Sequence, residues 1–242
     1  MKKTMLSLIG TLLFSTVFLG TSALAVEEVG QPAKSNGYVN FDYDDEDATL
    51  GTLRINKVSK INFGTTPTKG DTVTINSVYS AEDEKNGKYL PLNVQTIDNR
   101  GNGAGWQLQV QQTRQFTQLD EANVPLTDAN KLNGSLLEGA ELALTATQAA
   151  DLSIEQEANR VAPSIFKKVT LSTAEDAGFV TVTSAKENEG IGSWNTLFGE
   201  ISDATATENN AVTLKIPGEI KKNKDVSYEA ELTWTIVATP EI

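Results

Sequence analysis

The sequence predicts an all-β protein, a two-layer antiparallel β-sandwich with at most one short helix. Apolar residues recur with a period of two in many short segments, as strands with one buried face require. Turn-forming pairs such as Asn86-Gly87 and Asn133-Gly134 separate these segments. The chain contains no cysteine, so a packed core rather than disulfides must stabilise the fold.

Residues 1–25 have the features of a secretory signal peptide. A basic Lys-Lys pair precedes an apolar stretch over residues 5–20, and Ala23-Leu24-Ala25 offers a cleavage site of small residues. An uncleaved membrane anchor is the alternative, which the small residues and the acidic residues after them disfavour. We therefore expect an exported chain that begins near Val26, without direct membrane insertion.

Residues 26–49 are expected to form an acidic N-terminal segment ahead of one domain over residues 50–242. The run DYDDEDATL is typical of a solvated linker or loop. Asp42, Asp44 and Glu46 alternate as in a calcium loop, but the glycine and the bidentate glutamate that such a loop needs are missing. We expect no metal and no cofactor.

Alternation then predicts the strands in order along the chain. The last of them, YEAELTWTIVA, alternates most cleanly, with glutamates and threonines on its polar face. The stretch ATQAADLSIEQEANRV, residues 146–161, is the one segment with a composition that suits a short helix. The predicted strands lie within residues 53–57, 72–79, 89–97, 106–112, 141–146, 167–172, 179–184, 211–218 and 228–238.

Composition and charge exclude several classes of function. The net charge is −12, and removal of the two signal-peptide lysines takes it to −14. Such a chain repels nucleic acid and anionic membranes, and attachment to an anionic cell wall would need short-range contacts. With no histidine and no cysteine, the usual nucleophilic triads and zinc or copper sites are absent. No carboxylate stands in an apolar surround, so we predict a protein that is not an enzyme.

The stretch DNRGNGAGWQLQV leads into the strand that starts at Trp106. Its glycines resemble a phosphate loop, but a strand follows them rather than a helix, which excludes that mechanism. We expect Gly101, Gly103 and Gly105 to allow positive φ angles, and Asp98 and Arg100 to form a local ion pair.

Two motifs in this sequence resemble the WxL domain of surface proteins from low-GC Gram-positive bacteria. The proximal motif is Trp106-Gln107-Leu108. The distal motif, Y-x-x-x-[LIN]-T-W-x-L-x-x-x-P, matches at the C-terminus except for one isoleucine where leucine is usual. The resemblance spans roughly Leu50 to Ile242. The distal residues are Tyr228, Leu232, Thr233, Trp234, Ile236 and Pro240.

The resemblance implies a secreted, non-catalytic protein at the cell wall and cell surface that associates non-covalently with peptidoglycan, as a subunit of a surface complex. Its implied partners are other WxL proteins and a membrane-anchored WxL-interacting protein, and some family members contact host matrix proteins. The alternative is a protein-interaction module that binds such a partner or host extracellular matrix and touches the wall only indirectly.

The candidate ligand-binding residues surround the tryptophans. Two interpretations stay open for Trp106 and Trp234: their rings stack on sugars or on a partner, or they are core residues, as apolar strand faces usually are. Trp194 follows NEGIGS in a loop-like context, so its exposure stays open. The candidate ligand-binding residues are Trp106, Leu108, Trp194, Tyr228, Thr233, Trp234 and Ile236.

Overall fold

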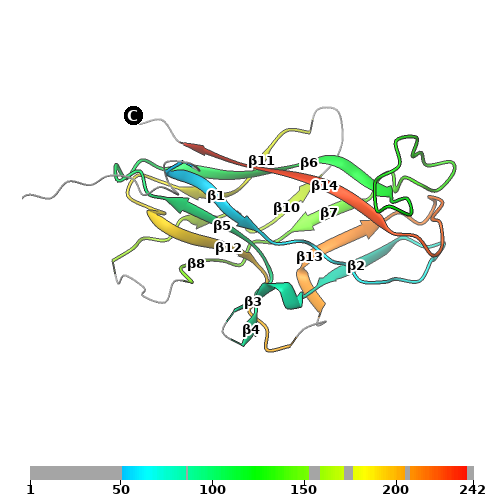
Figure 1. Ribbon diagram of the computed structural model, residues 1–242, viewed down its shortest axis with the longest axis horizontal. Coiled ribbons are helices and arrows are strands. Elements are labelled where there is room, and N and C mark those ends of the chain that lie inside the picture. The colour runs from blue at the N-terminus through cyan, green and yellow to red at the C-terminus, as the bar shows by residue number, and fades with distance from the viewer. Residues whose placement is uncertain (1–50, 86, 153–158, 172–176, 205–207, 239–242) are drawn as a thin grey trace, which may run out of the picture. The chain divides into compact units, whose positions relative to one another are not determined.

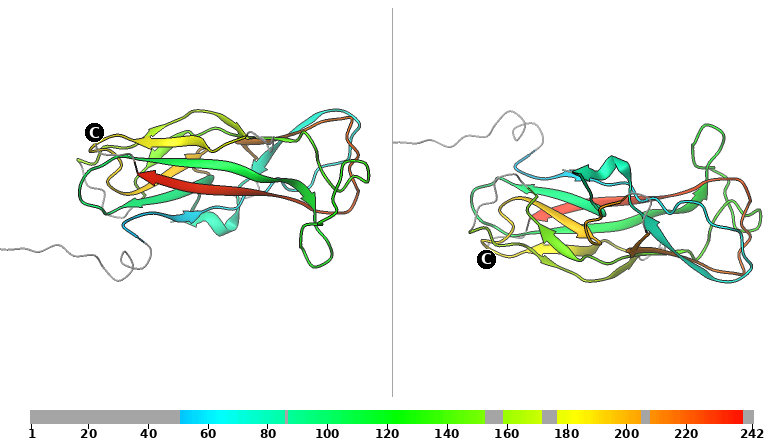
Figure 2. Two further views of the ribbon diagram at one scale, coloured as in Figure 1. Left: turned by 90° about the horizontal axis from the view of Figure 1, so that it is seen from above. Right: turned by 90° about the horizontal axis from the view of Figure 1, so that it is seen from below.

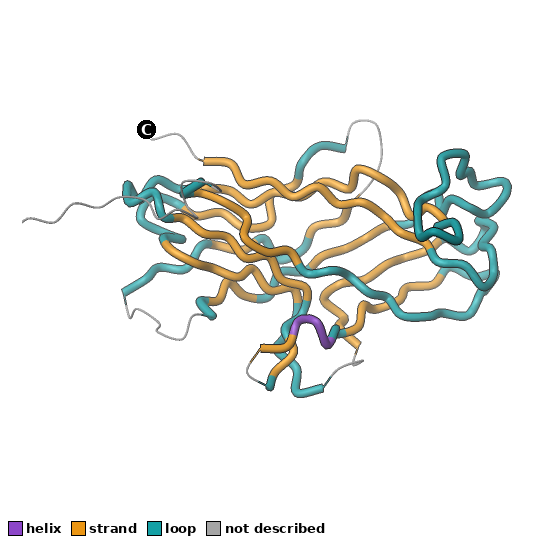
Figure 3. The backbone as a smooth tube through the Cα atoms, viewed as in Figure 1, coloured by secondary structure: helices purple, strands orange, loops and turns teal. Residues whose placement is uncertain are grey.

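The computed structural model describes residues 51–85, 87–152, 159–171, 177–204 and 208–238. Within these residues the secondary structure is almost entirely antiparallel strand, and the single turn of 3-10 helix, Ala81–Asp83, precedes a short hairpin (Figure 3). The hairpin strands are β3 (Glu84–Lys85) and β4 (Lys88–Tyr89).

Three four-stranded sheets contain the other strands (Figure 1). We name each sheet after one of its central strands. The β6 sheet has the order β14 (Tyr228–Ala238), β6 (Trp106–Gln118), β11 (Val180–Ala185), β9 (Ser164–Ile165). The β5 sheet has the order β1 (Leu53–Val58), β5 (Leu92–Asp98), β12 (Gly192–Phe198), β8 (Gln148–Ala150). The β13 sheet has the order β10 (Val169–Leu171), β7 (Glu141–Leu144), β13 (Glu208–Ile216), β2 (Val73–Val78).

The β6 sheet packs over the other sheets as a sandwich (Figures 1 and 2). Across the interior, the hydroxyl oxygens of Thr183 in β11 and Thr196 in β12 lie 2.8 Å apart. The rings of Phe198 in β12 and Trp234 in β14 have centroids 6.0 Å apart. The predicted all-β sandwich is confirmed.

One apolar cluster fills the space between the layers, with side chains from all three four-stranded sheets. Alternation places them there, since every second side chain of a strand points to the same face. Among the side chains with at most 1 % exposure are Val94, Trp106, Leu108, Val110, Leu142, Leu144, Val182, Phe198 and Val212.

The structure corrects two expectations. Residues 148–150, inside the predicted helix, form strand β8 and pair with β12, while residues 153–158 lie outside the described residues. The segment around Trp194 is not a loop, because it forms β12, paired with both β5 and β8. Tertiary pairing overrides local helix propensity in the first case.

Some expectations fall on residues that the structure does not describe. The proposed signal peptide, the acidic segment and the calcium-like run at Asp42, Asp44 and Glu46 all lie outside the described residues. Within the described ranges, no helix is long and apolar enough to cross a membrane.

Candidate functional site

The two tryptophan motifs lie on one pair of adjacent strands, although more than a hundred residues separate them in the chain. Strand β14 pairs antiparallel with β6, so that Trp234 is opposite Val110 and Ile236 is opposite Leu108. Trp106 is opposite Ala238 rather than Trp234. The two tryptophans are therefore offset by four residues, about 13 Å along the strand direction.

Trp106 is a core residue. Its side chain is 0 % exposed, as is that of Leu108. The indole Nε1 donates a hydrogen bond to the carbonyl of Gly190, 3.2 Å away. Gly190 has a φ of 67°, and a Cβ there would lie 2.9 Å from the indole ring. Only glycine lets this turn close over the ring, so Trp106 and the turn before β12 form one packed unit.

The loop from Asp98 to Gly105 is held by the expected ion pair. Arg100 donates from Nη2 to Oδ2 of Asp98 at 2.8 Å, and Asp98 is 3 % exposed. The same guanidinium donates to the carbonyls of Ala104 and Gly105. Gly101 and Gly103 have the predicted positive φ, but Gly105 does not. These contacts fix the conformation of the loop that precedes Trp106.

Trp194 is also buried, with 5 % exposure, and lies on β12 of the β5 sheet. Its Nε1 donates to the carbonyl of Ile191 at 3.0 Å. It is therefore not part of the strand pair that carries the two motifs.

The distal motif is less deeply buried than the proximal one. Tyr228, Trp234 and Ile236 are partly buried against the core, and Thr233 is exposed. No residue of β14 is fully buried, whereas β6 alternates between buried and half-buried side chains over its first seven positions. The difference arises because β14 is an edge strand.

Tyr228 connects two loops, and one of them is also bonded to the end of β6. Its hydroxyl donates to the carbonyl of Gly134 at 2.5 Å and accepts from the backbone N–H of Asn223 at 2.8 Å. The amide of Asn223 donates to Oε1 of Gln118 at 2.8 Å. Burial raises the pKa of the Tyr228 phenol, partly offset by the bond from Asn223. The distal tyrosine thus has a structural role in this fold.

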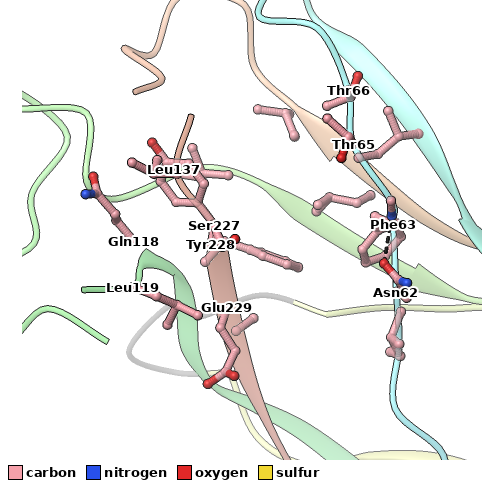
Figure 4. Close-up of a pocket in the computed structure, with 18 of the residues that line it drawn as sticks. Asn62, Phe63, Thr65, Thr66, Gln118, Leu119, Leu137, Ser227, Tyr228 and Glu229 are labelled. Atoms are coloured by element: carbon pink, nitrogen blue, oxygen red, sulfur yellow. Dashed lines mark hydrogen bonds between the residues drawn. The ribbon is translucent and has the colours of Figure 1, made fainter. Parts of the chain in front are cut away.

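A large open groove runs beside the first half of β14 (Figure 4). Its volume is about 1900 Å³, above the range of about 300–1,000 Å³ that is usual for small-molecule pockets. One wall is β14; the other includes residues 58–69, between β1 and β2. This volume is larger than a compact small-molecule ligand would fill.

The interior of the groove is apolar. Phe63 lies against Phe116 edge to face, with centroids 6.2 Å apart. Aliphatic side chains surround these rings, and amide and hydroxyl groups occur toward the rim, including those of Asn62 and Thr65. Aliphatic residues that line the groove are Ile55, Val73, Ile75, Leu92, Leu142 and Leu232.

Burial perturbs the ionisation of two side chains among the described residues. These are Tyr79 and Tyr228, whose pKa is raised. Burial raises the pKa of Tyr79, and the nearby carboxylate of Glu200 raises it further. No cluster of three metal-ligating side chains occurs in the described ranges.

Fold and site together define a β-sandwich with a tryptophan-bearing strand pair and an open groove beside it. The chain matches the family of WxL domains, described as surface cell wall-binding, over residues 31–240. It belongs to this family. Association with the cell wall and a location at the cell surface follow from that membership. No curated protein and no solved structure matches the chain.

The groove wall formed by residues 58–69 is the part of the candidate site that the sequence analysis missed. These residues include KINFGTTPTK, in which Ile61 and Phe63 alternate with polar residues as in a strand. Alternation was therefore visible, but it could not show that this segment lies across a groove from β14.

Proposed function

We propose that this protein binds peptidoglycan directly and non-covalently through the strand pair β6–β14, and that it has no catalytic activity. The observation that carries the proposal is the side-by-side pairing of the two motifs that define the family. Their inward side chains belong to the core, so the surface that this strand pair exposes is where we place the wall contact.

Further proposals concern the mature chain and its assembly. We propose that residues 1–25 are removed as a signal peptide and that residues 26–49 precede the domain of residues 50–242. The mature protein then serves as a subunit of a surface complex with other WxL proteins and a membrane-anchored WxL-interacting protein.

Sedimentation with purified sacculi tests direct wall binding. The sacculi are stripped of teichoic acid and protein, so that only peptidoglycan remains. We expect the purified mature protein to co-sediment, and to continue to do so at high salt, because packing and hydrogen bonds are not screened as exposed charges are. Loss of co-sedimentation with these sacculi at every salt concentration would overturn direct binding.

The groove supports a second candidate function, binding of a protein partner with only indirect wall contact. Strand β14 pairs with β6 on one edge and, within the described residues, with no strand on the other. An extended polypeptide can add to such an edge by main-chain hydrogen bonds and insert alternate side chains into an apolar groove. Binding to unstripped walls but not to stripped sacculi would favour this function.

A further inference from the structure

The outward face of the β6 sheet carries rows of uncharged side chains, most of them polar. Register places the outward side chains of β14, β6 and β11 in rows across the sheet. All of them are half-buried or exposed. The rows are Val237–Gln107–Ser184, Thr235–Gln109–Thr181 and Thr233–Gln111.

This face differs from the rest of the molecule in charge. The whole chain has a net charge of −12, yet the three rows contain no charged residue. Charged side chains occur beyond the Thr233–Gln111 row, toward the start of β14, where Arg114 contacts Glu229 and Glu231. A neutral ligand could therefore approach these rows without having to offer a matching charge.

Neighbouring side chains hold the glutamines in place. The Nε2 of Gln109 donates to Oε1 of Gln107 at 3.2 Å and to Oγ1 of Thr181 at 3.4 Å. The Thr181 hydroxyl in turn donates to Oε1 of Gln107 at 3.3 Å. The Nε2 of Gln111 donates to the carbonyl of Ala177 at 2.5 Å. These bonds order the amides before any ligand binds, which lowers the entropy lost on binding.

Donors and acceptors remain available on the ordered face. Within the part of the chain that the structure describes, the Nε2 of Gln107 and the Oε1 atoms of Gln109 and Gln111 make no hydrogen bond to protein. The face therefore offers amide donors and acceptors about 6.6 Å apart along β6, with threonine and serine hydroxyl groups about 4.8 Å away on the neighbouring strands.

We propose that this face is the wall-binding site and that its ligand is the uncharged, N-acetylated glycan backbone of peptidoglycan. This inference rests on the proposed function. Acetamide and hydroxyl groups of N-acetylhexosamines both donate and accept hydrogen bonds, as the glutamines and threonines do. The stem peptides carry charged groups, for which these rows hold no partner. A flat open array also suits a polymer that makes many weak contacts.

The test removes the amides of β6 and compares a matched control. The face variant combines Gln107→Ala, Gln109→Ala and Gln111→Ala. The control combines Thr74→Ala, Thr170→Ala and Thr213→Ala, outside the face on the β13 sheet. Binding is measured to stripped sacculi, to sacculi from which an amidase has also removed the stem peptides, and to soluble N-acetylglucosamine hexamers.

We expect the face variant to bind all three probes at least about tenfold more weakly than the wild type, which corresponds to about 1.4 kcal/mol. The control variant should bind as the wild type does. Because the alanines lower β-propensity in a central strand, a second variant, Thr235→Glu on edge strand β14, repeats the test. It places a charge in the neutral rows and should also weaken binding.

Three outcomes would overturn this inference while leaving the proposed function intact. These are unchanged sacculus binding by both face variants, an equal loss in the control, or failure of the wild-type protein to bind either the amidase-treated sacculi, whose freed lactyl carboxylates make them anionic, or the uncharged N-acetylglucosamine hexamers. The last result would identify the peptide as the ligand. Failure of the wild-type protein to bind stripped sacculi would instead overturn the proposed function itself.

Discussion

At the scale of single residues, the family's signature side chains divide into two kinds. Trp106 and Leu108 are completely buried and belong to the core. Tyr228, Trp234 and Ile236 are half-buried on the edge strand, where Tyr228 and Trp234 line the groove. The tryptophans of the two motifs therefore lie in different environments, one in the core and one at the edge of a sheet. The proximal motif stabilises the sandwich, whereas the distal motif also contributes to its surface.

Truncation of the two tryptophans should separate these roles. Trp106→Ala should lower the free energy of unfolding by about 3–5 kcal/mol, as emptied aromatic core sites do. Trp234→Ala should cost less, because part of that ring is already in solvent. Urea denaturation of both variants measures the difference. Equal losses would contradict it, and lost sacculus binding with unchanged stability would place the substituted ring on the contact surface.

The Tyr228 phenol should make stability depend on pH in the alkaline range. Its pKa is raised in the fold, so the protonated form is favoured there. This contribution is present below the unfolded pKa of about 10 and is lost as pH rises through the folded value. We expect the free energy of unfolding to fall less steeply above this pH in Tyr228→Phe than in the wild type.

Tyr79, the pKa of which is also raised, allows a comparison with Tyr228. Tyr79→Phe removes a phenol whose pKa is also raised, from a different part of the sandwich, where its hydroxyl donates to the carbonyl of Glu200 at 2.6 Å. If the free energy of unfolding fell equally steeply with pH in the wild type and in Tyr228→Phe, the alkaline pH dependence would not arise from Tyr228.

At the scale of elements, strands β6 and β14 differ although they pair along most of their length. β6 has neighbours on both edges, β14 and β11, while β14 has one, and its inward side chains face the groove. An exposed edge is a template for further strands. Threonines and glutamates occupy the outward face of β14, and four of its inward side chains line the groove: Tyr228, Ala230, Leu232 and Trp234.

Amide hydrogen exchange should report this difference. We expect amides of β6, residues 106–118, to be protected more strongly than those of β14, residues 228–238, because opening an edge strand breaks one ladder and exposes little core. Mass spectrometry of peptides from the two strands measures both in one sample. Equal protection of β14 in the isolated protein would contradict the open-edge description.

At the scale of the whole molecule, charge limits how the protein can reach the wall. With a net charge of −12 it is repelled by anionic polymers over about 8–10 Å at physiological ionic strength. The neutral rows of the β6 sheet reduce this repulsion only at contact distance. The sedimentation experiment should therefore be insensitive to salt with stripped sacculi, where the anionic teichoic acids are absent.

The sequence alone determined the fold class, most of the strands and the two motifs, because alternation and turn residues are local signals. The alternation in WQLQVQQ also places Gln107, Gln109 and Gln111 on the strand face opposite Trp106. Local signals misplaced residues 148–150 and the surroundings of Trp194, since pairing with distant strands decides both.

Only the tertiary structure decided which tryptophans are buried, that the two motifs pair, and that a groove opens beside β14. The physical reason is that burial depends on which sheet covers a strand and on whether that strand is central or at an edge. Alternation in one segment gives the two faces of a strand, but the contacts of each face come from segments far away in the chain.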